Sequence, residues 1–127
     1  RIGVVDDHLV MREGLASLLD EQKGMRVVGQ AASGEEAIAL LGEMVTDVVL
    51  MDVSMPDMDG IEATARIVSA HPDVGVLGLS MHKDPGTRQS MLDAGAFEFL
   101  CKSDSPGSII QSVRRFAESA RFASSRN

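Results

Sequence analysis

Short apolar runs alternate with amphipathic segments along this 127-residue chain, and this alternation limits the possible folds more than any other feature. The apolar runs occupy residues 2–5, 25–31, 47–51, 74–79 and 96–101. Runs of this length and composition are typical of strands that are covered on both faces. Segments with helical spacing of apolar residues follow at about 9–21, 33–44, 61–68, 85–93 and from 106 onward. Strand and helix therefore alternate five times, which predicts an α/β fold with a doubly wound, five-stranded parallel sheet and helices on both faces.

Local signals support this arrangement. Arg26 and Gln30 in the second run indicate an edge strand. Ser33 and Glu36 have the spacing of a capping box at the start of a helix. Ser105 followed by Pro106 predicts the N-terminus of the last helix.

Composition narrows the class of protein. The length suits one domain with one core, which we place at residues 1–118. Residues 119–127 lose the apolar periodicity and resemble a frayed helix end or the start of a linker. A net charge of −7 argues against direct binding of nucleic acid by this domain. The single cysteine excludes an internal disulfide, and no apolar run is long enough for a membrane span, so we expect a cytoplasmic location.

Polar side chains follow four of the five expected strands, at the points where these strands end. They are Asp6, Asp7, Asp52, Ser80 and Lys102. The carboxyl ends of parallel strands lie at one edge of a sheet, where α/β folds bind ligands, so these groups should converge. Three carboxylates repel one another and need positive charge, which Lys102 and a hard cation such as Mg²⁺ can supply. A carboxylate in such a place can attack phosphorus, and the cations can offset charge on the transferring phosphoryl group.

Four segments together resemble one known family. They are VVDDH at 4–8, VVLMDVSMPDMDG at 48–60, LGLSMH at 77–82 and GAFEFLCKS at 95–103. In order and spacing they resemble the receiver domain of two-component response regulators. The LSMH segment and the serine after the lysine are most similar to the NarL/FixJ-type group. This resemblance implies a flavodoxin-like sheet with strand order 2-1-3-4-5, in agreement with the alternation above.

The resemblance also implies roles for the residues of the site. Asp52 matches the phospho-acceptor, and Lys102 matches the lysine that pairs with the phosphoryl oxygens. Asp7 matches a direct Mg²⁺ ligand, together with Asp52 and the backbone carbonyl of Ser54. Asp6 matches the acid that holds a water of the metal. The implied protein is a regulatory phospho-acceptor domain that assists its own phosphorylation and dephosphorylation.

The switch and the partners follow from the same resemblance. Ser80 matches the hydroxyl that moves toward the phosphoryl group, and Phe99 matches the aromatic residue that turns inward with it. A histidine kinase would be the phosphodonor, and phosphorylation would favour a homodimer. DNA would be reached only through a helix-turn-helix domain that lies outside this chain, and the result would be control of transcription. No membrane partner is expected.

Some positions depart from the common pattern of the family. Met81 stands where a small residue is frequent and could restrict access to Asp52, while His82 lies at a variable position near the mouth of the site. Ser103 follows the lysine in place of a proline. We interpret His8 as a surface residue and Cys101 as a small buried filler.

Three alternatives stay open. An aspartate-nucleophile phosphatase usually carries a second Asp two residues after the nucleophile, where this chain has Ser54. A flavodoxin-like nucleotide or flavin carrier needs a loop after the first strand that accepts phosphate, whereas Asp6 and Asp7 would repel it. A receiver-like module that interacts without being phosphorylated is compatible with the sequence.

Overall fold

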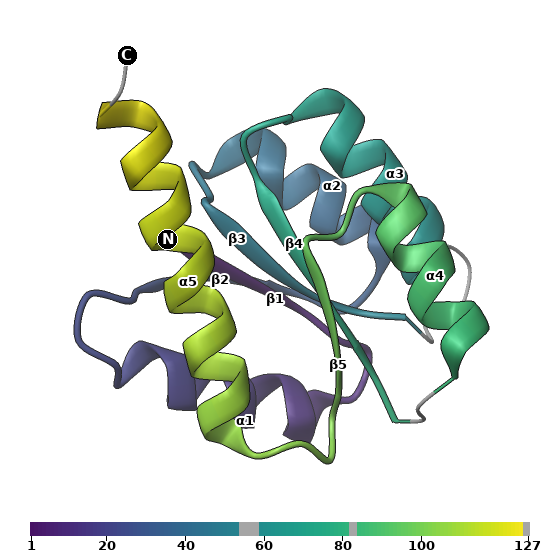
Figure 1. Ribbon diagram of the computed structural model, residues 1–127. Helices are drawn as coiled ribbons and strands as arrows, with labels where there is room; N and C mark the ends of the chain where they lie inside the picture. The colour runs from purple at the N-terminus through teal and green to yellow at the C-terminus, as the bar shows by residue number, and fades with distance from the viewer. Residues whose placement is uncertain (54–58, 82–83, 126–127) are drawn as a thin grey trace.

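A computed structural model, which describes residues 1–53, 59–81 and 84–125 with side chains up to residue 120, contains five strands that alternate with five helices (Figure 1). The strands are β1 (Ile2–Val5), β2 (Val27–Ala31), β3 (Val48–Asp52), β4 (Gly75–Ser80) and β5 (Glu98–Cys101). The helices are α1 (Leu9–Asp20), α2 (Gly34–Glu43), α3 (Gly60–Ala70), α4 (Pro85–Ala94) and α5 (Pro106–Ser125). Among these described residues, no helix is both long and apolar enough to cross a membrane.

The strands form one parallel sheet in the order β2-β1-β3-β4-β5, which confirms the predicted topology and the place of β2 at an edge. Helices α1 and α5 cover one face of the sheet, and α2, α3 and α4 cover the other (Figure 1). Because all strands run the same way, their carboxyl ends lie at a common edge. This edge carries the polar residues that the sequence singled out.

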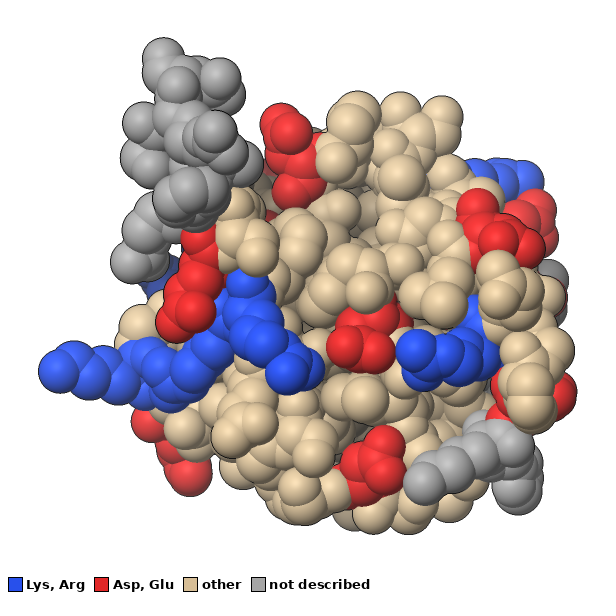
Figure 2. Space-filling view, in the orientation of Figure 1, with Lys and Arg blue, Asp and Glu red and all other residues tan. Residues whose placement is uncertain are grey.

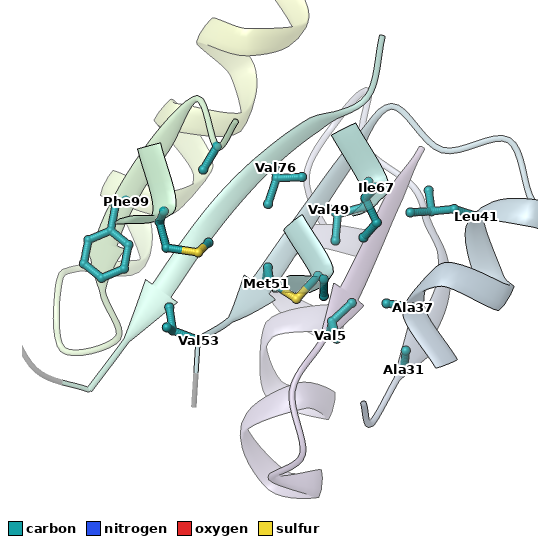
Figure 3. Packing of buried hydrophobic residues seen from close by; sticks show 13 residues of the cluster. Val5, Ala31, Ala37, Leu41, Val49, Met51, Val53, Ile67, Val76 and Phe99 are labelled. Atoms are coloured by element: carbon teal, nitrogen blue, oxygen red, sulfur yellow. The ribbon is translucent and has the colours of Figure 1, made fainter. Parts of the chain in front are cut away.

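The core consists of two apolar layers that the sheet separates. In β3, Val49 and Met51 belong to the layer under α2, α3 and α4, which Figure 3 shows from close by. Val48 and Leu50 alternate with them and belong to the layer under α1 and α5. All four are at most 2% exposed, so β3 is buried on both faces as its unbroken apolar run predicts.

Short polar side chains begin four of the helices, and at α4 the Asp84 carboxylate accepts the N–H of Gly86 at 3.1 Å. Ser33 Oγ accepts a hydrogen bond from the N–H of Glu36 at 3.1 Å, which confirms the predicted start of α2. Asp59 caps α3 in the same way, and Ser105 Oγ accepts the N–H of Ser108 at 3.3 Å at the start of α5. These bonds satisfy N–H groups that have no partner within the helix.

Two strands begin two residues later than the apolar pattern suggests. We expected the last strand from residue 96, but β5 begins at Glu98. Gly95 has a φ of 116° and ends α4, and the N–H of Ala96 then donates to the carbonyl of Met91 at 3.0 Å. The residues before β5 therefore complete a helix end. Likewise β2 begins at Val27, because the N–H of Met25 closes a turn onto Gln22 at 3.1 Å.

Helix α5 continues without a break to Ser125. The domain boundary at residue 118 that the sequence suggested stays a prediction. On the face seen in Figure 1, Lys and Arg side chains gather in the region of α5 beside acidic ones, and most of the remaining face is uncharged (Figure 2).

Candidate functional site

Two buried carboxylates lie side by side at the carboxyl edge of the sheet. Asp6 directly follows β1, and Asp52 is the last residue of β3. These strands are neighbours, with Val5 paired to Met51, so the next residue of each strand brings a carboxylate to the same place. Asp6 is 1% exposed and Asp52 is 2% exposed. Burial of two carboxylates together is costly unless positive charge lies within reach.

Lys102 supplies this positive charge. It follows β5, two strands away from Asp52, and its side chain is only 3% exposed. The ammonium nitrogen lies 2.8 Å from Asp6 Oδ2 and 3.3 Å from Asp52 Oδ1. One buried ammonium group thus bridges carboxylates from two different strands.

The environment of Asp6 keeps its carboxyl group ionised. Burial alone raises the pKa of Asp6, but hydrogen bonds from Lys102 and from the backbone N–H of His8, with the charge of Lys102, outweigh burial. The pKa of Asp6 therefore lies below its ordinary value. An ionised carboxylate is the form that can bind a cation.

Four side chains offer a place for a metal ion. One ligand atom from each of Asp6, Asp7, His8 and Asp52 lies within 4.8 Å of the others. Three of these are carboxylate oxygens, the ligands that Mg²⁺ prefers, and the side chain of Asp7 is 28% exposed and so open to a hydrated ion. The donor set therefore fits Mg²⁺. Ser54, whose carbonyl we expected to contribute, lies outside the described residues.

Sequence reasoning missed two contacts around Asp6. We interpreted His8 as a surface residue. Its side chain is 68% exposed, yet its Nδ1 lies 3.3 Å from Asp6 Oδ1 and 3.2 Å from Asp7 Oδ1. Arg12 donates from its guanidinium to the backbone carbonyl of Asp6 at 2.9 Å and to Gln30 at 3.2 Å. The contact of His8 could have been predicted, because His8 directly follows two aspartates in the sequence. The contact of Arg12 could not, because it depends on how α1 packs beside β2.

The two residues that the resemblance identifies as a switch lie on the neighbouring strands. Ser80 ends β4 and is 7% exposed. Phe99 in β5 is 6% exposed, pairs with Gly78 in the sheet and belongs to the same apolar layer as Met91 of α4. A side chain at Gly78 would collide with both Met91 and the Phe99 ring, so a glycine there makes room for the aromatic residue.

The start of α3 packs directly against the backbone of Asp52. The N–H of Gly60 donates to the carbonyl of Val53 at 3.0 Å, and the N–H of Val53 donates to Leu79 at 3.0 Å. A Cβ atom on Gly60 would overlap the carbonyl oxygen of Asp52. Only glycine permits this close approach, which fixes the strand end that carries Asp52.

An apolar groove lies beside the acidic site, between α1 and the segment after β5. His8, Val10, Met11, Leu15, Met81, Lys102 and Ile109 are among its lining residues. Val10 is 85% exposed and Met81 is 58% exposed. The predicted influence of Met81 on access to Asp52 stays a prediction, and His82 lies outside the described residues.

Comparison with known proteins gives a consistent result. The response regulator receiver domain family matches residues 2–114. Response regulator GacA of Pseudomonas viridiflava is 37% identical over 124 residues, which are 98% of this chain and 58% of that protein. Response regulator UvrY of Escherichia coli (strain K12) is 35% identical over 122 residues, which are 96% of this chain and 56% of that protein. The chain thus spans a little over half the length of these relatives.

Solved structures agree with the sequence relatives. The signal receiver domain of response regulator NarL from Mycobacterium tuberculosis has a TM-score of 0.86 and 34% identity, with 95% of both chains covered. A CheY-like receiver domain from Methanospirillum hungatei has a TM-score of 0.89 at 21% identity, with 97% of both chains covered, and supports the fold alone. The chain therefore belongs to the response regulator receiver domains of two-component systems, and its relatives place it in the NarL/FixJ-type group.

Proposed function

We propose that Asp52 accepts a phosphoryl group from a phosphohistidine of a histidine kinase and that this modification switches the domain between two states. The observation that carries the proposal is the buried ammonium of Lys102, which contacts Asp6 at 2.8 Å and Asp52 at 3.3 Å. A cation in this position can offset negative charge on an incoming phosphoryl group and hold the nucleophile in place.

The transfer forms one bond and breaks another. A carboxylate oxygen of Asp52 attacks phosphorus, and the P–N bond to the donor histidine breaks. Charge accumulates on the phosphoryl oxygens, and the Lys102 ammonium lies close enough to share it. The side chains of Asp52 and Lys102 are each 3% exposed, so the nucleophile and the ammonium are largely shielded from bulk water.

Asp6, Asp7 and Asp52 are the carboxylates that would hold Mg²⁺. When bound, Mg²⁺ supplies Lewis acidity and positive charge for the phosphoryl oxygens. Asp7 is the most open of the three and would be the principal direct ligand, whereas Asp6 is also held by Lys102 and by His8.

Ser80 and Phe99 would carry the effect of phosphorylation from Asp52 to the face formed by α4, β5 and α5. A phosphoryl group on Asp52 offers new acceptors for the Ser80 hydroxyl at the end of the adjacent strand. Phe99 packs beside Met91, so a shift in this region would reach α4 and the face formed by α4, β5 and α5. A change in this face would favour a homodimer and alter an output domain. For relatives of this group, that output would be DNA binding and transcription control.

The apolar groove beside the site suits the approach of the kinase. A helix that carries a phosphohistidine must bring phosphorus to Asp52 while it buries apolar side chains of its own. Val10 and Met81 offer exposed apolar surface next to Lys102. We propose this groove as the docking surface of the phosphodonor.

Intact mass after incubation with acetyl phosphate tests the chemistry. We expect a gain of one phosphoryl group in the wild type with Mg²⁺, and no gain without Mg²⁺ or in Asp52→Asn. Asp73→Asn is a matched control, because Asp73 is exposed and precedes β4 at the opposite edge of the sheet. A folded wild type that binds Mg²⁺ but gains no mass would favour a phosphorylation-independent interaction module.

A further inference from the structure

The turn after β5 is closed by hydrogen bonds on both sides of Lys102. The N–H of Asp104 donates to the carbonyl of Cys101 at 2.9 Å. In the opposite direction, the N–H of Cys101 donates to Asp104 Oδ2 at 3.0 Å. Lys102 and Ser103 therefore lie between Cys101 and Asp104, which are joined by one backbone hydrogen bond and one hydrogen bond to the Asp104 side chain.

Asp104 holds this turn on the outer side of β5. β5 is the edge strand of the sheet, so N–H groups on its outer side have no further strand to pair with. Asp104 supplies the acceptor for the N–H of Cys101. Ser103 leaves the backbone free of the fixed φ that a proline ring would impose. A side chain that reaches back to the strand is an alternative way to fix such a turn.

A second set of contacts ties the turn to the end of β4. The Cys101 thiol lies 3.0 Å from Ser103 Oγ and donates to the carbonyl of Met81 at 3.5 Å. The N–H of Lys102 donates to the carbonyl of Ser80 at 2.7 Å. The backbone of Lys102 is thus held on its inner side by β4 and on its outer side by the bond between Cys101 and Asp104.

Fixing this backbone matters because the Lys102 side chain is long. Four rotatable bonds separate its Cα from the ammonium that contacts Asp6 and Asp52, and a change in backbone direction moves the ammonium by more than it moves the Cα. The ammonium must stay within about 3 Å of two carboxylates on two other strands.

We infer that Asp104 is a positioning residue for phosphoryl transfer: it locks the turn after β5 and so aims the Lys102 ammonium at Asp52. The inference rests on the proposed function of Asp52 as phospho-acceptor. Asp104 acts through Lys102 and need not touch the phosphoryl group.

A double-mutant cycle with Lys102 tests this role. The rate of phosphorylation by acetyl phosphate with Mg²⁺ is measured by intact mass. We expect Asp104→Ala to slow it on the order of tenfold, because misplacement by about 1 Å can cost up to about a hundredfold. Asp104→Asn keeps an oxygen that accepts the Cys101 N–H and should stay near the wild-type rate. In a Lys102→Ala background, Asp104→Ala should change the slower rate by less than about twofold, because the group that it positions is gone.

Asp73→Ala is the control for the loss of one carboxylate, because Asp73 is exposed and lies at the opposite edge of the sheet. It should leave the rate unchanged in both backgrounds. An equal slowing by Asp104→Ala with and without Lys102 would show a general structural effect and overturn the inference. A wild-type rate in Asp104→Ala would overturn it as well.

The NMR signal of the Lys102 ammonium gives a second readout that does not depend on phosphoryl transfer. We expect this signal to shift or broaden in Asp104→Ala and to stay in place in Asp104→Asn and Asp73→Ala. If the wild type takes up no phosphoryl group, the proposed function fails, and this signal still decides whether Asp104 positions Lys102. An unchanged signal in Asp104→Ala would refute the positioning role.

Discussion

Replacing Gly60 with alanine tests whether the first turn of α3 fixes the strand end that carries Asp52. The added methyl group would overlap the carbonyl oxygen of Asp52 and lie 2.7 Å from the Cα of Val53. Both neighbours are backbone atoms at the end of a strand that is buried on both faces, so no side chain can rotate away. Either α3 or the end of β3 must move, and the end of β3 carries Asp52.

The size of the effect follows from this crowding. An extra carbon in a tightly packed region costs about 1–3 kcal/mol of unfolding free energy. With an unfolding entropy of about 2.1 cal/mol/K per residue, each 1 kcal/mol lowers the Tm of a chain of this length by roughly 4 °C. We therefore expect Gly60→Ala to melt about 4–11 °C below the wild type. Phosphorylation by acetyl phosphate should slow on the order of tenfold, because Asp52 is displaced.

Thermal unfolding followed by circular dichroism measures the fall in Tm. Intact mass, recorded over time, measures the rate of phosphorylation. Gly14→Ala is the matched control, because a Cβ on Gly14 would meet nothing within 4 Å. In the interior of α1, alanine in place of glycine should raise the stability by about 0.5–1 kcal/mol. If Gly60→Ala melted with the wild type and was phosphorylated at the same rate, the proposed role of this close approach would be wrong.

Three further predictions concern the groove, a helix start and the acidic site. Val10→Glu should slow transfer from the kinase, because it places a charge on apolar surface that is 85% exposed, and leave the rate with acetyl phosphate unchanged. Ser33→Ala should lower the unfolding free energy in urea by about 1 kcal/mol, because it removes the acceptor for the Glu36 N–H. The pKa of Asp6 is below its ordinary value in the folded chain, so the stability that Asp6 contributes is present above about pH 4 and lost as the pH falls through the folded pKa. Unfolding measured between about pH 5 and pH 2.5 should therefore show a weaker pH dependence in Asp6→Asn than in the wild type.

The sequence predicted the fold and the edge that carries the site for the same physical reason. Unbroken, β-branched apolar runs such as Val48 to Met51 favour strands covered on both faces, and helices between parallel strands provide this cover. Once the strands are parallel, the residues that follow them meet at one edge. Asp6, Asp52 and Lys102 could therefore be placed together from their positions alone, although they lie far apart in the chain.

Contacts between side chains and backbone in the loops could not be predicted in this way. Arg12 bonds to the carbonyl of Asp6, and Asp104 bonds to the N–H of Cys101, but nothing in the spacing of these residues indicates the partner. Such bonds depend on the direction in which the chain leaves each strand. The late start of β5 has a similar cause, because the end of α4 uses the N–H of Ala96 before the strand can pair.

The register of β5 decides whether a lysine after this strand becomes part of the site. Ser80 pairs with Cys101, and the N–H of Lys102 then donates to the carbonyl of Ser80 at 2.7 Å. A shift of one residue would turn Phe99 away from the layer that contains Met91 and would put Cys101 or Ser103 at the position of Lys102, and neither side chain is long enough to reach Asp52. The burial of Phe99 and the contact of Lys102 with Asp52 are therefore consequences of one register. This linkage explains why an aromatic residue three positions before a lysine is informative as a pair, whereas either residue alone is compatible with an ordinary core or surface position.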